Sequence, residues 1–229
     1  MNSSFFVFLA FCTIDLATES MLVSTVQEDQ PLLVGPKRSD VLPEDLAAAR
    51  QKMVTTRGSF KRMQELAKRG SVSKVRLQRA ELEKRIAELE LEALENPELA
   101  NRNQRLIAKL NLEFSKNKLA RSKKLFSTGS VSELDYRRDL YQLKYAQIGW
   151  KEATGEISAD IAKIQIAQQR LKLAQTELDL GQRLYEKKSL SRSTIQELQQ
   201  RVKEIEQELG KLKHQQKLKK QKLDQQRRT

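Results

Sequence analysis

The side chains that most often do catalytic chemistry are scarce in this sequence of 229 residues. It contains a single cysteine, Cys12, and a single histidine, His214. With one of each we expect no zinc cluster, no cysteine–histidine pair and no Ser–His–Asp triad. Carboxylates are abundant, but on charged helices they generally form solvated faces rather than catalytic pairs. We therefore predict that the protein is not an enzyme, holds neither metal nor cofactor, and works by binding other proteins.

Composition indicates that long helices carry these side chains. Charged residues make up 32% of the chain and aromatic residues only 5%, which is poor material for a globular core and typical of coiled coils. Three of the four prolines precede residue 44, and beyond that point only Pro97 interrupts the chain. So few helix breakers predict an all-α domain over residues 44–228.

The N-terminal segment has an apolar run at residues 5–14. The run is too short to span a bilayer, which needs about 20 residues, and it resembles the apolar core of a secretory signal. Small residues near Ala17 suit cleavage, whereas no basic residue precedes the run and Asp15 follows it directly. Two interpretations stay open: a signal peptide over 1–20, which implies export, or a short apolar segment that packs on the helices. Residues 21–43 are predicted to be a linker.

One segment occurs three times in the sequence. The three copies read RMQELAKRGSVS, RSKKLFSTGSVS and LGQRLYEKKSLS, and they end at Ser73, Ser132 and Ser191. These serines are spaced 59 residues apart each time, and a fixed long period indicates a repeated structural unit.

Each copy predicts the end of one helix and the start of the next. Basic residues fill the last turn, where they favour the negative end of the helix dipole. Gly70 and Gly129 supply the left-handed residue that closes a helix, and the last serine is an N-cap. The third copy has Lys188 in place of the glycine, so we expect a looser turn there. Its N-cap is Ser191 or Ser193, of which Ser193 fits a capping box slightly better.

Seven-residue periodicity between these tips predicts antiparallel coiled-coil hairpins, elongated and built from repeats of about 59 residues. The seam after the last tip consists of Ile195, Leu198, Val202, Ile205, Leu209 and Leu212. The row before it consists of Leu143, Trp150, Ile157, Ile164, Leu171 and Leu178. Because this row crosses Gly155 without a slip, residues 133–187 are predicted to form one helix of about 80 Å. The third tip would then lie at the opposite end from the first two.

Asn96 and Pro97 predict a break, because the residue before a proline avoids helical geometry and proline favours the first helical position. We expect helices near 74–95 and 98–128 on its two sides. An earlier helix is expected at about 44–69, where apolar residues also recur at seven-residue spacing.

Two copies of the tip share one spacing of arginine, leucine and serine, in Arg121, Leu125 and Ser132 and again in Arg62, Leu66 and Ser73. The tip RSKKLFSTGSVSELDY resembles the helical hairpin of HlyD-type periplasmic adaptor (membrane fusion) proteins. Those adaptors carry Arg-x3-Leu-x6-Ser where they engage a TolC-type outer-membrane channel. NPEL at 96–99 also looks like the point where such adaptors enter their hairpin. The third tip keeps Leu184 and Ser191 but has Leu180 in place of the arginine.

The resemblance implies a periplasmic or envelope-located component of an export or efflux system. Its implied partners are a TolC-type channel and an inner-membrane transporter, and such proteins also self-associate. The turn at Gly129, Ser132 and Asp135 is similar to that of TolC-type channel subunits, so a divergent channel subunit is one alternative. The other is a cytoplasmic structural scaffold or tether, in which arginine, leucine and serine only close a hairpin. No stretch has the strand pattern of the β-rich domains that flank such hairpins in adaptors.

The formal net charge is +13, and basic residues concentrate at the C-terminal end. This tail is either a solvated helix end or a contact with the anionic headgroups of a membrane. No aromatic residue lies in 186–229, so bases have nothing to stack on and we do not expect nucleic-acid binding there.

Overall fold

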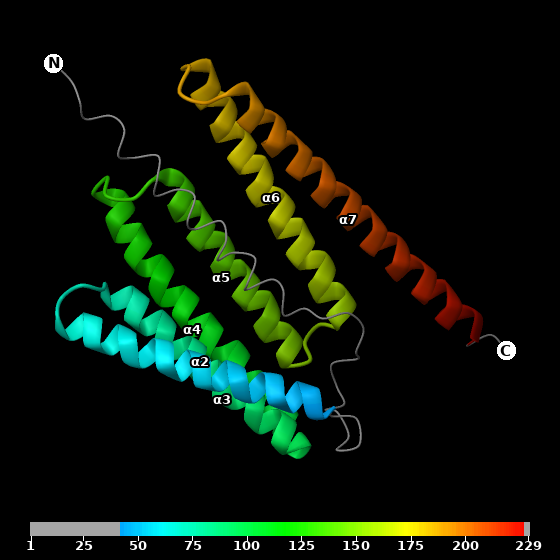
Figure 1. Cartoon of the computed structure of the whole chain (residues 1–229). Coiled ribbons are helices and arrows are strands. Elements are labelled where there is room, and N and C mark those ends of the chain that lie inside the picture. Colours follow the sequence, from blue (N-terminus) through cyan, green and yellow to red (C-terminus); the bar gives the residue numbers. More distant parts are fainter. Residues whose placement is uncertain (1–41, 227–229) are drawn as a thin grey trace. The chain divides into compact units, whose positions relative to one another are not determined.

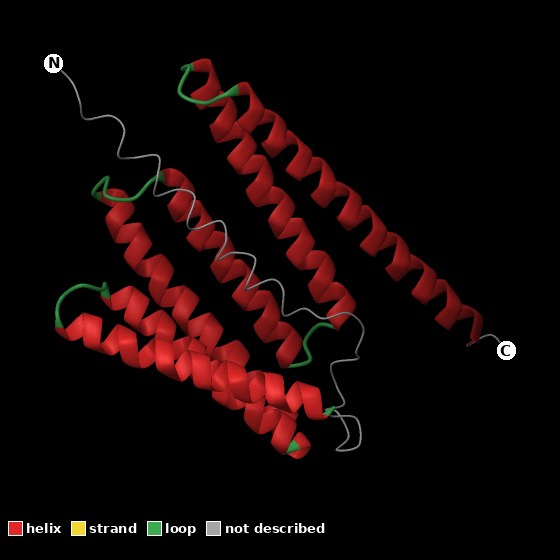
Figure 2. Ribbon diagram, viewed as in Figure 1, coloured by secondary structure: helices red, strands yellow, loops and turns green. Residues whose placement is uncertain are grey.

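The computed structural model describes residues 42–226, and 88% of these residues are helical, with no strand among them (Figures 1 and 2). The elements are α2 (Pro43–Lys68), α3 (Lys74–Glu95), the 3-10 helix η1 (Pro97–Leu99), α4 (Ala100–Ser127), α5 (Glu133–Ala153), α6 (Ala159–Glu186) and α7 (Arg192–Gln226). The all-α prediction is confirmed. The predicted signal peptide over 1–20, and all but the end of the predicted linker over 21–43, lie outside the described residues.

Each helix packs against the next one along the chain. Between α2 and α3, Arg50 pairs with Glu95 at 3.0 Å and Arg57 with Glu88 at 3.7 Å. Since the residue numbers rise along one helix as they fall along the other, the two helices run antiparallel.

The same argument applies to α6 and α7, which lie side by side in Figure 1. Arg170 pairs with Glu208 at 3.2 Å, and Asp160 pairs with Lys219 at 3.0 Å. The pair encloses a small core of Ile164, Ala167 and Leu209, against which Leu171 and Leu212 pack. Part of the predicted seam of α7 therefore does face a neighbouring helix.

Gly181 of α6 lies directly under apolar side chains of α7 near the turn that connects the two helices. A Cβ atom at this position would lie 2.8 Å from Leu198 Cδ1 and 3.3 Å from Ile195 Cδ1. Such contacts are shorter than van der Waals distance, so an alanine at this position would require the ends of the Leu198 and Ile195 side chains to shift.

The predicted break at Asn96–Pro97 is confirmed, because α3 ends at Glu95 and Pro97 opens η1. Asn103 of α4 is 2% exposed and donates from Nδ2 to the carbonyl oxygen of Leu89 at 3.1 Å. Its second bond, to a carboxylate oxygen of Glu92, measures 3.0 Å. These bonds fix the end of α3 to the start of α4. The first predicted helix, 44–69, agrees with α2 to within one residue at each end.

The single helix predicted over 133–187 is wrong. α5 ends at Ala153 and α6 begins at Ala159, with a turn at 154–158. Gly155 has φ +79, and its backbone N–H donates to the carbonyl oxygen of Glu152 at 2.9 Å. Ile157, the member of the seven-residue row that lies in this turn, is half-buried. An apolar residue is therefore suited to this position even though it is not part of a helix. A row that passes through a turn cannot distinguish one long helix from two that fold back.

The position predicted for the third tip is wrong for the same reason. Arg138 of α5 bonds to Glu177 of α6 at 3.1 Å, although α5 begins at Glu133 and α6 ends at Glu186. The start of α5 therefore lies beside the end of α6. The turn that follows α6 lies at the same end as the turn that precedes α5.

Candidate functional site

Four turns close their helices with the same backbone geometry. We call 69–73, 128–132 and 187–191 the first, second and third tip turns, and 154–158 the back turn. In each, one residue has a left-handed backbone: Gly70 (φ 71), Gly129 (φ 71), Lys188 (φ 57) and Gly155 (φ 79).

Two backbone hydrogen bonds close each of these turns, in the arrangement known as the Schellman motif. In the second tip turn, the N–H of Gly129 donates to the carbonyl oxygen of Phe126 at 3.0 Å and that of Ser130 to Leu125 at 2.8 Å. The third tip turn has the equivalent bonds, from Lys188 at 2.8 Å and from Ser189 at 2.9 Å. The expectation of a looser third turn is therefore wrong, since lysine adopts the left-handed conformation and both bonds form.

A serine caps the helix that follows each turn, by accepting a backbone N–H three residues on. The bonds are Arg76 to Ser73 at 3.3 Å, Asp135 to Ser132 at 3.1 Å, Ile161 to Ser158 at 3.5 Å and Thr194 to Ser191 at 3.2 Å. The predicted cap at Ser132 is confirmed. In the third tip turn the cap is Ser191 rather than Ser193.

The leucine of the predicted triplet is exposed in every tip turn. Leu66, Leu125 and Leu184 have 38%, 40% and 44% of their surface exposed. Each lies four residues before the left-handed residue of its turn, and its carbonyl oxygen accepts the longer-range of the two closing hydrogen bonds. In the back turn Lys151 occupies that position and its carbonyl oxygen accepts the same bond, from Glu156 at 2.8 Å. The turn therefore forms without a leucine.

The two predicted arginines differ in their surroundings. Arg62 is exposed. Arg121 is partly buried, with its Nη2 atom 3.5 Å from Gln78 Oε1 on α3. It also lines an open groove of about 280 Å³ between α3 and α4, together with Leu82 and Phe114. The two triplets thus share a spacing along the chain but not the environment of their guanidinium groups.

Residues that the sequence reasoning did not single out extend the exposed apolar surface. Phe126 and Tyr185, each next to a tip leucine, are 40% and 44% exposed. Phe126 stacks on Tyr136 of α5, with ring centroids 5.0 Å apart and an interplanar angle of 9°. The back turn was missed as well, although Thr-Gly-x-apolar-Ser occurs both at 128–132 and at 154–158 and would have revealed it.

The structure places the predicted site residues in two roles. The hydroxyls of Ser73 and Ser132 are engaged as helix caps, and that of Ser132 also donates to Asp135 Oδ2 at 2.6 Å. The leucines instead present apolar atoms to solvent. Of the predicted triplet, leucine is thus the member that is exposed in every tip turn, whereas the arginine is exposed at Arg62 and partly buried at Arg121.

Among the described residues, no three His, Cys, Asp or Glu side chains are grouped so that they could hold a metal ion. One carboxyl has a perturbed affinity for protons: burial raises the pKa of Glu152, against the opposing effect of the Lys163 ammonium. Within residues 42–226, no helix is long and apolar enough to cross a membrane.

Comparisons with protein-family models, with curated proteins and with solved structures found no match for this chain.

Proposed function

We propose that this chain is a non-enzymatic, adaptor-like component of an envelope export or efflux system, and that its tip turns dock a TolC-type outer-membrane channel. In this proposal the helices form elongated antiparallel coiled-coil hairpins, built from repeats of about 59 residues. An inner-membrane transporter is the second partner, and the chain self-associates.

The comparison of Leu125 with Lys151 carries the proposal. Both residues occupy the same position of the same hydrogen-bonded turn, so the backbone accepts either a leucine or a lysine there. The turn does not need this leucine, which is 40% exposed. Burying its apolar surface against another surface would gain free energy that contact with water does not give. Its recurrence at Leu66 and Leu184 favours a shared binding role over a chance exposure.

A structural scaffold is the second candidate, and the serine caps favour it. Ser73 and Ser132 are accounted for by helix capping, which needs no partner. The two candidates therefore differ in what they require of Arg121 and of the leucines, which contact a partner only in the first.

Site-specific photo-crosslinking tests the proposal. A photoreactive amino acid at Lys124, which is exposed beside the second tip turn, is expected to crosslink a TolC-type channel in envelope membranes. Lys151, which is exposed beside the back turn, is the matched control position and is expected not to crosslink it. Crosslinks of equal yield at the two positions, or no channel at either, would contradict docking by the tips.

A further inference from the structure

The three tip turns lie at one end of their helices and nearly level with one another. Gln78 and Arg121, which are in contact, are each eight residues from the left-handed residue of their own turn, Gly70 and Gly129. The first and second tip turns therefore lie at the same end of α3 and α4, level to within the reach of these two side chains.

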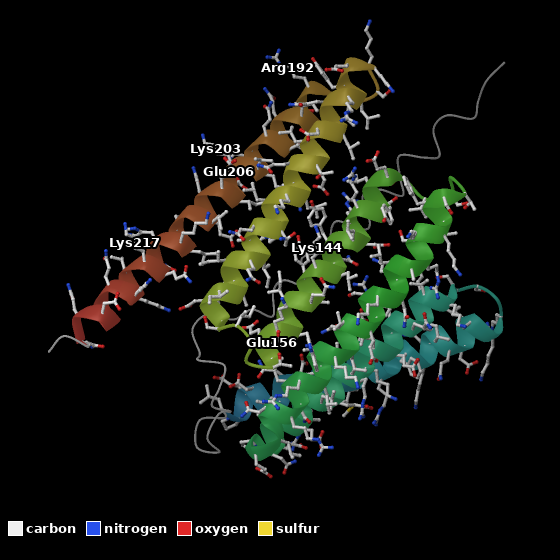
Figure 3. All side chains as sticks on the ribbon, turned by 180° about the vertical axis from the view of Figure 1, so that it is seen from behind. Lys144, Glu156, Arg192, Lys203, Glu206 and Lys217 are labelled. Carbon is white, nitrogen blue, oxygen red and sulfur yellow. The ribbon has the colours of Figure 1, made fainter. Side chains whose placement is uncertain are left out.

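The contact between Arg138 and Glu177 allows the same comparison for the second and third tip turns, by counting residues from each contact residue to the left-handed residue of its turn. Arg138 is nine residues from Gly129, and Glu177 is eleven residues from Lys188. A difference of two residues amounts to about 3 Å along a helix. The back turn lies at the other end of α6, as Glu156 and Arg192 show in Figure 3.

The exposed apolar residues of these turns therefore share one end. They are Leu66, Leu125, Phe126, Leu184 and Tyr185, and they account for five of the nine large apolar residues that are exposed in the described part of the chain.

The same end carries uncompensated positive charge. Exposed cations without an ion-pair partner among the described residues include Arg69, Lys123, Lys124, Arg183, Lys187 and Lys188. Of the nearby carboxylates, Glu65 pairs with Lys68 at 3.4 Å and Glu133 with Arg137 at 2.7 Å. The exposed Glu186 offsets one cation of the third tip turn, where Arg183, Lys187 and Lys188 still leave an excess. A surface that covers the leucines must therefore also face this excess of cations.

We propose that the three tip turns form a single docking face, that the third turn belongs to it although it lacks the arginine, and that the face binds an acidic protein surface. This rests on the proposed function, because it names the chemistry of the partner that the tips dock. The third tip has Leu180 where the other two have an arginine. Lys187 and Lys188 supply the cations there instead, and Leu184 and Tyr185 supply the apolar area.

The exposed fractions favour a protein over a lipid surface. Each tip leucine has about 40% of its surface free, so more than half of it is already covered within the chain. Such a side chain forms a shallow ridge that fits a shaped recess, whereas insertion into a bilayer requires apolar atoms that reach past the headgroups. Carboxylates beside such recesses would complement the cations and favour correct orientation.

Binding of the full chain to a purified TolC-type channel tests this, with dissociation constants measured for matched serine variants. Leu125→Ser and Leu184→Ser are each expected to weaken binding about fivefold, since each removes apolar area of a half-exposed leucine. Leu218→Ser is the control, because Leu218 is 43% exposed but lies next to Lys219, which pairs with Asp160 at the opposite end of α6. Raising NaCl from about 0.05 to about 0.5 M is expected to weaken binding further, because salt screens charges.

The outcomes separate the two proposals. If Leu125→Ser weakens binding and Leu184→Ser does not, the third turn is not part of the face, and the proposed function survives. Binding that does not respond to salt would overturn the acidic partner alone. If the channel does not bind, the proposed function fails and this inference with it. Binding instead to vesicles that contain phosphatidylglycerol, with the same loss in both tip variants, would identify a lipid surface and overturn the protein partner.

Discussion

Arg138 of α5 and Arg201 of α7 bind the two oxygens of one carboxylate, that of Glu177. The distances are 3.1 Å to Oε1 and 3.0 Å to Oε2, and the side chain of Glu177 is 4% exposed. One buried charge thus joins three consecutive helices near the third tip turn. This arrangement holds the end of α6 against the start of α5, which is the condition for the second and third tip turns to share an end.

Glu177→Gln is expected to lower the free energy of unfolding by about 1–3 kcal/mol, because it removes a buried partner of two arginines that remain partly solvated. Glu208→Gln is the control, since the pair of Glu208 with Arg170 is more exposed and its loss should cost less than about 1 kcal/mol. Urea denaturation followed by circular dichroism measures both. Equal losses would show that burial of Glu177 contributes nothing.

Two glycines of α5 and its following turn should respond in opposite directions to alanine. Gly155→Ala is expected to destabilise by about 1–2 kcal/mol, because its φ of +79 is unfavourable for alanine. Gly149→Ala is expected to stabilise by up to about 1 kcal/mol, because Gly149 lies inside a helix with open space around it. Thermal unfolding provides the comparison. If both substitutions stabilise, the chain is a continuous helix at 155.

Ser132→Ala is expected to destabilise by about 1 kcal/mol, because the backbone N–H of Asp135 loses its acceptor. Ser130→Ala, two residues earlier, is the matched control, because the Ser130 hydroxyl contacts only that of Thr128 in an exposed position. The two variants are compared by chemical denaturation. A control that loses as much stability as Ser132→Ala would argue against the cap.

Arg121→Ala is expected to cost less than about 1 kcal/mol, since its bond to Gln78 is long at 3.5 Å. Ile164→Ala should cost about 2–4 kcal/mol, because Ile164 belongs to the core between α6 and α7. The melting temperatures of the two variants decide the matter. Should Arg121→Ala be as damaging as Ile164→Ala, the arginine has a structural role and the docking role assigned to it fails.

The pKa of Glu152 gives a dependence of stability on pH. Burial raises this pKa from 4.5 in the folded chain, so the folded state holds the proton more tightly than the unfolded state. Stability from this group is therefore lost as the pH rises from about 4.5 through the raised pKa. Glu152→Gln, which stays neutral, is expected to raise the melting temperature at pH 7 but not at pH 4. Glu206→Gln, at an exposed position of α7, should change neither value, and a matching rise there would exclude burial as the cause.

Much of the local structure could be predicted from the sequence because its causes are local. A proline sets the break at Asn96–Pro97, and Gly129 with Ser132 closes one helix and caps the next through bonds that span a few residues. Burial of side chains is less predictable. The spacing of the triplet predicted the same role for Arg62 and Arg121. Arg62 is exposed, whereas Arg121 lies beside Gln78 of α3. The physical reason is that α2 packs against one helix, α3, while α4 packs against two, α3 and α5.

The sequence by itself determined that this chain is helical and where most of its helices end, since helix geometry and capping depend on neighbours within one or two turns. Only the tertiary structure decided that the chain folds back at Gly155 and that the third tip turn joins the other two. The physical reason is that a seven-residue apolar row is compatible with one helix or with two antiparallel ones. Contacts between residues far apart in the sequence, such as Arg138 with Glu177, select the second.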